Sequence, residues 1–179
     1  MILCALREDS SPHAEDDFEI LITRRTERLE THKGQYALPG GSVDAEDGPP
    51  GSEMSLVTAA LRETEEEVGI RSERIRPFGV LPPIWTPTGF LVTPVLGLLD
   101  TPLEKAVVIP SEEEIDLWFW CRMSRLRSQE IYSVESREIS LGGETIRVPV
   151  DVFQIDAHRV WGATGAILKN FIGRWEKLG

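Results

Sequence analysis

Short apolar runs separated by polar turns cover most of the chain and predict a fold rich in strands. Residues 1–7 and 18–23, MILCALR and FEILIT, lie on either side of the polar, acidic segment 8–17, as two successive strands would. Further strand-like runs lie at residues 35–41, 75–83, 89–100 and 116–123, with residues 84–88 as a proline-broken turn and residues 137–155 as a hairpin about Gly142 and Gly143.

Two segments instead carry apolar residues at helical spacing. Residues 55–69 predict one helix, capped by Ser52 or Ser55 and ended by Gly69. Residues 161–178 predict the other. Many strands with two principal helices indicate an α/β fold, a mixed sheet covered on both faces, in a single domain of residues 1–179. The apolar stripe of the first helix comprises Val57, Ala60, Leu61, Thr64 and Val68, and the second directs Leu168, Phe171, Ile172 and Trp175 into the core.

The first helix also carries an acidic face beside its apolar stripe. With about 100° of rotation per residue, Glu66 lies at about −60° and Glu67 at about +40° from Glu63, whereas Glu65 falls on the far rim. Like charges four residues apart destabilise a helix by about 0.2 to 0.5 kcal/mol per pair unless something neutralises them. A divalent cation would do so, because hard ions such as Mg²⁺ bind carboxylates together with substrate phosphates. The alternative is an ordinary solvated acidic face.

Composition and charge narrow the class of protein. The 179 residues are 41 % hydrophobic and 27 % charged, which is usual for a globular domain that buries its own core. A net charge of −11 disfavours nucleic acid and anionic membranes as partners. Without a long apolar run or a basic leader, we expect no membrane span and no secretory signal, and the cytoplasm as location. Cys4 and Cys121 lie in apolar, strand-like segments and are expected to be buried free thiols.

The segment RETEEEVGI, residues 62–70, resembles the second half of the box of the Nudix hydrolase family, G-x5-E-x7-R-E-U-x-E-E-x-G-U, where U is a bulky apolar residue. Upstream the sequence departs from it, because Met54 stands at the first glutamate, and Gly40 and Gly41 anchor a longer loop with residues 47–53 as an insertion. The resemblance implies a Nudix-type α/β/α sandwich with a mixed central sheet, a catalytic helix and a C-terminal helix. The matching residues are Arg62, Glu63, Glu66, Glu67, Gly69 and Ile70, with Thr64 in the first U place.

A second stretch, residues 21–47, is similar to the motif of the coenzyme A pyrophosphatase branch, L-L-T-x-R-S-x3-R-x3-G-x3-F-P-G-G, usually followed by x-x-D. Glu30 occupies the place of the second arginine. The resemblance implies Mg²⁺-dependent hydrolysis of the diphosphate bond of coenzyme A or acyl-CoA to 3′,5′-adenosine bisphosphate and 4′-phosphopantetheine. The alternatives are an ADP-ribose or nucleoside-diphosphate-sugar pyrophosphatase of the same fold, and a Nudix-like module that binds a nucleotide without cleaving it. The matching residues are Leu21, Thr23, Arg25, Gly34, Pro39, Gly40, Gly41 and Asp44, with conservative changes at Ile22, Thr26 and Leu38.

The resemblance also assigns roles on the acidic face. Glu66 and Glu67 are expected to be the principal ligands of Mg²⁺, with Mn²⁺ as an alternative ion. Glu63 is expected to be a further metal ligand or the general base. Arg62 is counted among the catalytic residues, because it would hold Glu66 in position through an i to i+4 ion pair.

Other candidate site residues lie outside the helix. Glu114 is the best candidate for a later acid that shares the catalytic work, with Glu113 next, and the alternative is a solvated loop acid. Gly40 and Gly41 allow a substrate to approach the backbone closely, although a plain tight turn also uses glycine. The aromatic residues that would line an adenine or pantetheine pocket, or else belong to the core, are Trp85, Phe90, Trp118 and Trp120.

One basic cluster interrupts the acidic sequence. Its cations are Arg24, Arg25, Arg28, His32 and Lys33. Because arginine and lysine form charge-assisted bonds to phosphate, the cluster suits the 3′-phosphorylated adenosine of the substrate, and the alternative is a solvated loop. The family includes dimers, and the predicted hairpin, over residues 137–150, offers an edge for a homodimer.

Overall fold

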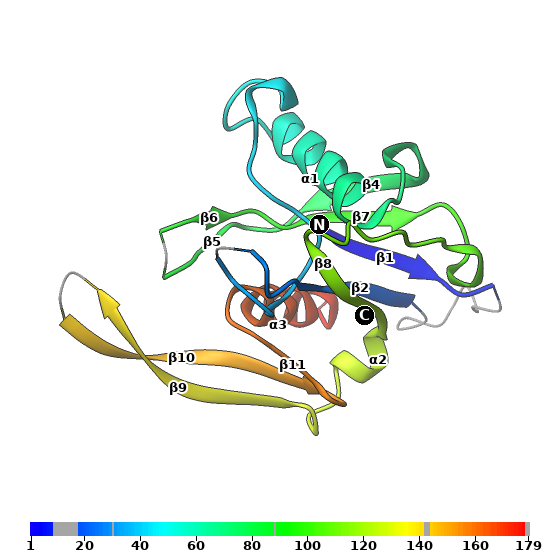
Figure 1. Ribbon diagram of the computed structural model, residues 1–179. Coiled ribbons are helices and arrows are strands. Elements are labelled where there is room, and N and C mark those ends of the chain that lie inside the picture. Colours follow the sequence, from blue (N-terminus) through cyan, green and yellow to red (C-terminus); the bar gives the residue numbers. More distant parts are fainter. Residues whose placement is uncertain (9–17, 30, 88, 142–143, 178–179) are drawn as a thin grey trace.

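The structure, a computed structural model, describes residues 1–8, 18–29, 31–87, 89–141 and 144–177. A six-stranded mixed sheet forms its centre (Figure 1). The strands run in the order β3-β2-β1-β7-β4, with β8 on the other edge of β2; β1 and β7 are parallel and the other pairs are antiparallel. Their bounds are β1 Ile2–Leu6, β2 Phe18–Arg25, β3 Tyr36–Ala37, β4 Ile75–Val80, β7 Val95–Leu99 and β8 Ile115–Arg122.

The two faces of this sheet pack against different helices. Successive side chains of a strand point to opposite faces, so Ile2 and Cys4 join the core under α3 (Ala163–Trp175), whereas Leu3 and Ala5 join the core under α1 (Glu53–Val68). The predicted α/β/α sandwich is therefore confirmed. The predicted core residues of α3 are also confirmed, with Leu168, Phe171 and Ile172 buried and Trp175 partly buried against them.

The first predicted helix begins earlier than expected. It starts at Glu53 because the Ser52 side chain accepts the backbone N–H of Ser55 at 3.1 Å. It ends at Val68, and Gly69 adopts a left-handed φ of 68° at the cap. A Cβ at Gly69 would lie 2.7 Å from the carbonyl oxygen of Ile109, so only glycine allows that loop to approach the helix end.

The proline-broken segment after β4 is not simply a turn, which corrects the prediction for residues 84–88. Ile84–Trp85 form strand β5, which pairs with β6, Leu91–Val92, in a separate two-stranded sheet. The hairpin closes because the main chains of Thr86 and Phe90 bond to each other at 2.8 Å. The turn residues therefore bring two short apolar segments together, a pairing that local sequence does not reveal.

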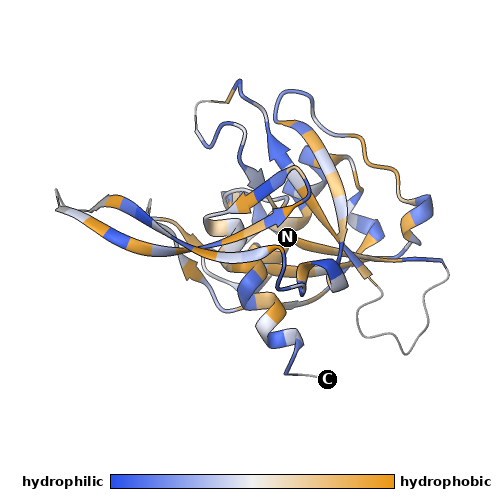
Figure 2. Cartoon of the chain, turned by 90° about the horizontal axis from the view of Figure 1, so that it is seen from below, coloured by the Kyte–Doolittle hydropathy of each residue, from blue (hydrophilic) through white to orange (hydrophobic). Residues whose placement is uncertain are grey.

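A second antiparallel sheet covers the far side of α3, which lies between the two sheets in Figure 1. Its order is β11-β10-β9, and the predicted hairpin is confirmed by the pairing of Leu141 with Glu144, although Gly142 and Gly143 lie outside the described residues. Figure 2 shows hydrophilic and apolar residues alternating along this hairpin. The strands are β9 Tyr132–Leu141, β10 Glu144–Ile155 and the unpredicted β11 His158–Trp161, and the short helical segments are η1 Ala45–Asp47, η2 Ser72–Arg74, η3 Leu103–Lys105 and α2 Met123–Leu126.

The two cysteines are buried free thiols, as predicted. Cys4 on β1 and Cys121 on β8 both pair with Ile20 of β2, from opposite edges of that strand. Burial raises the pKa of each thiol to about 12, so both are inert and serve as core residues. Within the described part of the chain, none of the helices has the length and apolarity of a membrane span.

Leu168 offers a test of the layered core. Its side chain is fully buried, so Leu168→Ala leaves a cavity and is expected to lower the free energy of unfolding by about 2 to 5 kcal/mol. Met54→Ala on α1 is the control, because Met54 is 71 % exposed and its loss should change that free energy by less than about 0.5 kcal/mol. Urea denaturation followed by circular dichroism measures both, and equal losses would contradict the arrangement.

Candidate active site

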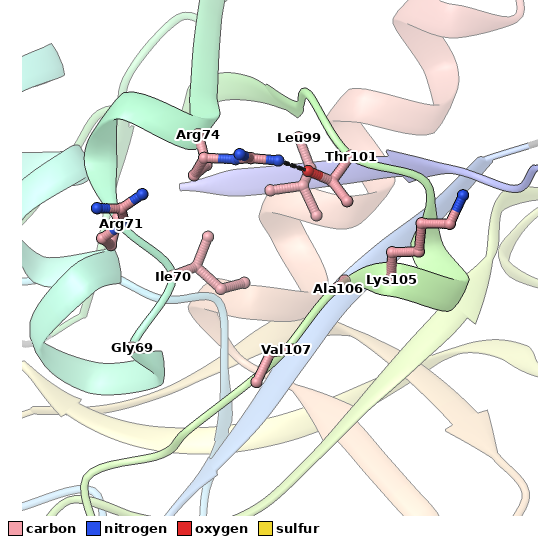
Figure 3. A pocket seen from close by; sticks show the side chains of 9 residues that line it. All are labelled: Gly69, Ile70, Arg71, Arg74, Leu99, Thr101, Lys105, Ala106 and Val107. Carbon is pink, nitrogen blue, oxygen red and sulfur yellow. Dashed lines mark hydrogen bonds between the residues drawn. The ribbon is translucent and has the colours of Figure 1, made fainter.

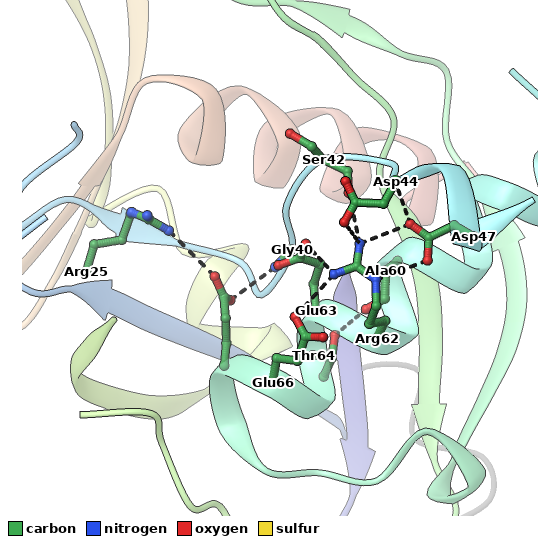
Figure 4. Close-up of polar contacts among 11 residues, drawn as sticks. Arg25, Gly40, Ser42, Asp44, Asp47, Ala60, Arg62, Glu63, Thr64 and Glu66 are labelled. Atoms are coloured by element: carbon green, nitrogen blue, oxygen red, sulfur yellow. Dashed lines mark hydrogen bonds and ion pairs between the residues drawn. The ribbon is translucent and has the colours of Figure 1, made fainter. Parts of the chain in front are cut away.

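The three glutamates of the predicted acidic face differ sharply in burial. The side chain of Glu66 is 56 % exposed, that of Glu63 17 % and that of Glu67 3 %. The face therefore runs from solvent into the protein within one turn of α1. Figure 4 shows the polar contacts that surround it.

Arg62 lies at the centre of these contacts. Its guanidinium donates to Glu63 Oε1 at 2.8 Å and to Glu66 Oε2 at 3.1 Å, which confirms the predicted i to i+4 pair. It also donates to the Ser42 carbonyl at 3.1 Å and to both carboxylate oxygens of Asp47 at 3.0 Å (Figure 4). The hydrogen bonds to Asp47 first and then to Glu63 raise the pKa of Arg62 and keep it a permanent cation.

Asp47 was not among the predicted site residues. Its buried side chain also accepts the backbone N–H of Asp44 at 2.7 Å, and the hydrogen bond from Arg62 holds the pKa of the Asp47 carboxyl below its usual value. Met54, at the first glutamate place of the Nudix box, is 71 % exposed and takes no part. Asp47 therefore fastens the long loop to the helix, and the only sequence signal for it is the spacing of two acids at the start of a helical turn.

Glu67 connects the helix to two other segments. Its carboxylate accepts the backbone N–H of Gly40 at 3.1 Å and lies 3.5 Å from Nη1 of Arg25. Burial raises the pKa of Glu67 to about 7, although the Gly40 bond and the Arg25 charge oppose the rise. The negative charge of Glu114 adds to it, which places that predicted later acid near Glu67.

Main-chain bonds fix the loop that carries Glu114. The N–H of Ile109 donates to the Val68 carbonyl and that of Ser111 to the Glu67 carbonyl, both at 2.9 Å. The N–H of Glu114 then donates to the Ser111 carbonyl at 3.0 Å. The loop is thus fastened to the C-terminal end of α1, while the neighbouring Glu113 remains exposed.

Gly41 leaves the space that the Glu63 carboxylate occupies. A Cβ on Gly41 would lie 2.4 Å from Cδ of Glu63, closer than any real contact. The loop and the carboxylate can therefore approach each other only because residue 41 has no side chain.

A cleft of about 530 Å³ opens at the Gly40–Gly41 loop, which contacts Glu67 and Glu63. None of the predicted catalytic glutamates is among its described lining residues. Of the predicted binding residues, Arg25, His32, Gly40, Gly41 and Phe90 line it. The predicted contacts Arg28 and Lys33 are exposed in the loop beyond β2 and are not among the lining residues, although His32 of the same loop is. The rest of the lining is mostly apolar and includes Leu38, Val43, Leu56, Ala59, Leu91 and Ile167, which suits a ligand with both charged and apolar parts.

The predicted aromatic pocket is only partly assembled. Trp85 and Phe90 stand on the β5–β6 hairpin with 73 % and 61 % of their surface exposed, and of the two only Phe90 is among the described lining residues of the cleft. Trp120 is partly buried in the core under α1, and Trp118 is 37 % exposed on β8. His158 is structural, because it stacks on Phe119, a ring packed against the core.

Comparison with known proteins identifies the family. Residues 10–140 match the family described as NUDIX domain. The chain belongs to the Nudix family. It is 38 % identical over 151 residues to the uncharacterised Nudix hydrolase NudL of Citrobacter koseri, covering 84 % of this chain and 71 % of that protein. The NudL of Enterobacter sp. strain 638 is similar to the same extent, 38 % over 151 residues, 84 % of this chain and 71 % of that protein.

Solved Nudix structures are also similar to the chain. A MutT/nudix family protein from Enterococcus faecalis is 19 % identical, with a TM-score of 0.49 over 99 % of this chain and 60 % of that one. A C. elegans Ap4A hydrolase is 26 % identical, with a TM-score of 0.44 over 58 % of this chain and 68 % of that one. The family match and the NudL relatives show that the protein is a Nudix hydrolase, an enzyme class that cleaves diphosphate bonds of nucleotide derivatives.

Nudix hydrolases use a divalent cation such as Mg²⁺, and the donors of this site fit one in kind. Glu63, Glu66 and Glu67 supply only carboxylate oxygens, the ligands that hard cations prefer. In the described residues, no group of three acidic, histidine or cysteine side chains is placed to hold a metal ion. In this arrangement Arg62 pairs with Glu63 and Glu66, and Arg25 pairs with Glu67.

A smaller pocket of about 240 Å³ is lined by cations that already have carboxylate partners (Figure 3). Arg71, Arg74 and Lys105 line it, but each cation has a carboxylate partner. The partners are Glu73 at 3.7 Å, Asp100 at 2.8 Å and Glu8 at 2.5 Å, respectively.

The Asp47 bond to Arg62 predicts a loss of activity on Asp47→Asn. The amide keeps the shape but loses the charge that orients Arg62, so turnover is expected to fall by about 10- to 100-fold, as for other residues that orient metal ligands. Asp44→Asn is the matched control, because Asp44 has only a 3.3 Å contact to Arg62 and a side chain 65 % exposed. Initial rates decide, and equal losses in both variants would contradict the role of Asp47.

The raised pKa of Glu67 predicts a pH-dependent gain in stability on Glu67→Gln. The folded protein favours the protonated carboxyl, so the contribution of this group is complete below its ordinary pKa of 4.5 and is lost as the pH rises through about 7. With EDTA present, Glu67→Gln is expected to raise the Tm by at least about 2 °C at pH 8 and to leave it unchanged at pH 4.5. Differential scanning calorimetry measures this, with Glu65→Gln as control, and a lower Tm at pH 8 would refute it.

Proposed function

We propose that this Nudix hydrolase cleaves the diphosphate bond of coenzyme A or acyl-CoA, with Mg²⁺, to 3′,5′-adenosine bisphosphate and 4′-phosphopantetheine. The observation that supports it best is the overlap of motif and cleft. Arg25, Gly40 and Gly41 belong to the coenzyme A pyrophosphatase motif, and all three line the cleft beside Glu67. The mixed polar and apolar lining suits a substrate that joins a diphosphate to a long pantetheine arm.

Each residue then has a chemical task. Glu66 and Glu67, with Glu63, would hold Mg²⁺, which when bound neutralises the diphosphate and lowers the pKa of the attacking water. Glu63 or Glu114 would accept the proton of that water. Arg62 orients Glu63 and Glu66 through bonds of 2.8 and 3.1 Å.

The remaining cleft residues would bind the substrate. Arg25 and the glycine backbone at residues 40–41 would contact the diphosphate, and Phe90 would contact the pantetheine or adenine part. His32 lines the cleft on the side of the basic loop. Arg28 and Lys33 are exposed on that loop, so they would contact the 3′-phosphate only at the outer end of the cleft.

The second candidate is hydrolysis of ADP-ribose or a nucleoside-diphosphate sugar. One observation favours it: Glu30, outside the described residues, replaces the second arginine of the coenzyme A motif. An acidic residue there weakens the case for a bound 3′-phosphate.

Location and partners complete the proposal. We place the enzyme in the cytoplasm, acting on small molecules and not on nucleic acid, in keeping with its net charge of −11. A homodimer would form through the β9–β10 hairpin, because β9 pairs with β10 alone among the described strands and so presents a free edge.

Product identification tests the substrate. With Mg²⁺ and coenzyme A, mass spectrometry should find both products, and EDTA should abolish them. Glu66→Gln is expected to reduce turnover by about 100-fold or more, since it removes a proposed metal ligand. Glu65→Gln is the matched control, because Glu65 bonds the Ser72 N–H on the far rim instead. Faster turnover of ADP-ribose than of coenzyme A would favour the second candidate.

A further inference from the structure

Arg25 occupies a place where strand pairing changes register. Along the β2–β8 pair, Arg24 lies opposite Leu117 and Arg25 opposite Ile115, so a bulge falls between the two arginines. A bulge re-aims the side chains that follow it. Arg24 forms a bidentate pair with Asp116, at 2.7 and 3.0 Å. Arg25 instead lines the cleft and directs its guanidinium toward α1 (Figure 4).

The backbone of Arg25 is held on its other edge as well. Its N–H donates to the Gln35 carbonyl and its carbonyl accepts the N–H of Gly34, both at 3.0 Å. The start of the side chain is therefore fixed, and movement is left to the guanidinium.

That guanidinium is poorly satisfied. Its contact with Glu67 is long, 3.5 Å, and its Nε is buried without a hydrogen-bond partner in the described structure. Arg62 nearby makes bonds of 2.8 to 3.1 Å to its partners. An arginine has five N–H donors, so Arg25 retains unused capacity at the wall of the cleft.

A loose pair of this kind is a poor resting state for both groups. The Glu67 side chain is 3 % exposed and the Arg25 side chain 24 %, so both have lost water, and although Glu67 accepts the Gly40 N–H, neither side chain gains a short bond from the other. Better partners exist for each, namely a phosphate for the planar guanidinium and a divalent cation for the carboxylate. A diphosphate with its bound cation supplies both at once.

We propose that Arg25 is the resident counter-ion of Glu67 in the free enzyme and is exchanged when substrate binds, the cation taking the carboxylate and the diphosphate taking the guanidinium. The inference rests on the proposed function only in requiring a diphosphate ligand. It makes the metal and the diphosphate bind cooperatively, because either one alone has to break the pair. Arg25 is then a positioning residue for Glu67 as well as a substrate contact.

Binding of Mn²⁺ in the absence of any nucleotide tests the exchange. Electron paramagnetic resonance at pH 8.5 measures free Mn²⁺ with the unaltered protein and with Arg25→Gln and Arg25→Met, which remove the competing charge in polar and apolar form. Both variants are expected to bind Mn²⁺ about five- to tenfold more tightly. Arg24→Gln is the matched control on the adjacent residue and should leave binding unchanged. Equal or weaker Mn²⁺ binding by the Arg25 variants would overturn the proposal.

The unaltered protein gives a second measurement, in which a variant serves only to assign the signal. The Nε–H signal of Arg25, assigned through Arg25→Lys, is expected to move in ¹⁵N NMR when Mg²⁺ and methylenediphosphonate are added together, and that of Arg24 is not. A stationary Arg25 signal would refute the exchange. Neither measurement uses coenzyme A, so the exchange can fail while coenzyme A is still hydrolysed, and the reverse.

Discussion

One guanidinium holds the acidic site together. Glu63 and Glu66 lie within a turn of Arg62 on α1, and the buried Asp47 faces them from the preceding loop. Like charges so close destabilise a helix unless they are neutralised. Arg62 meets them with bonds of 2.8 to 3.1 Å to side-chain and main-chain oxygens, which its rigid set of five donors makes possible. The contact that relieves the repulsion therefore also fixes the long loop against the helix.

Glu67, the buried residue of the acidic face, likewise joins separate segments of the chain. Glu67 receives the Gly40 N–H and the Arg25 guanidinium, and its own carbonyl receives the N–H of Ser111. Three segments distant in the sequence thus meet at one residue of α1. In the free protein the expected metal ligands already accept hydrogen bonds or form ion pairs within the structure, so a cation would not enter a vacant, preformed site. It would replace arginine at groups already in use, so the cost of binding lies in breaking these pairs.

Features that depend on local sequence pattern could be predicted, whereas features that depend on pairing between distant segments could not. Helical spacing was enough for the acidic face and for the core side of α3, because both depend on residues within a few turns of each other. The β5–β6 pairing and the packing of the second sheet on α3 depend on contacts between distant segments, which periodicity does not contain. Asp47 was missed for the same reason. From the sequence alone an acidic loop residue is expected to be solvated, and only the structure shows that it bonds to Arg62. Arg25 and Arg28 look equivalent in the sequence, but only Arg25 lines the cleft.

A protein with a net charge of −11 that handles an anionic substrate must reverse its field locally. Arg25 at the end of β2 contributes one positive charge at the cleft, while Arg62 is already neutralised by its own carboxylates. That single arginine cannot balance a diphosphate, because it carries one positive charge and the Glu67 carboxylate beside it opposes that charge. The balance shifts only if a cation joins Glu67 and leaves Arg25 to the phosphates. The deficit of positive charge in the cleft is thus a physical reason, independent of any sequence motif, for substrate and metal to arrive together.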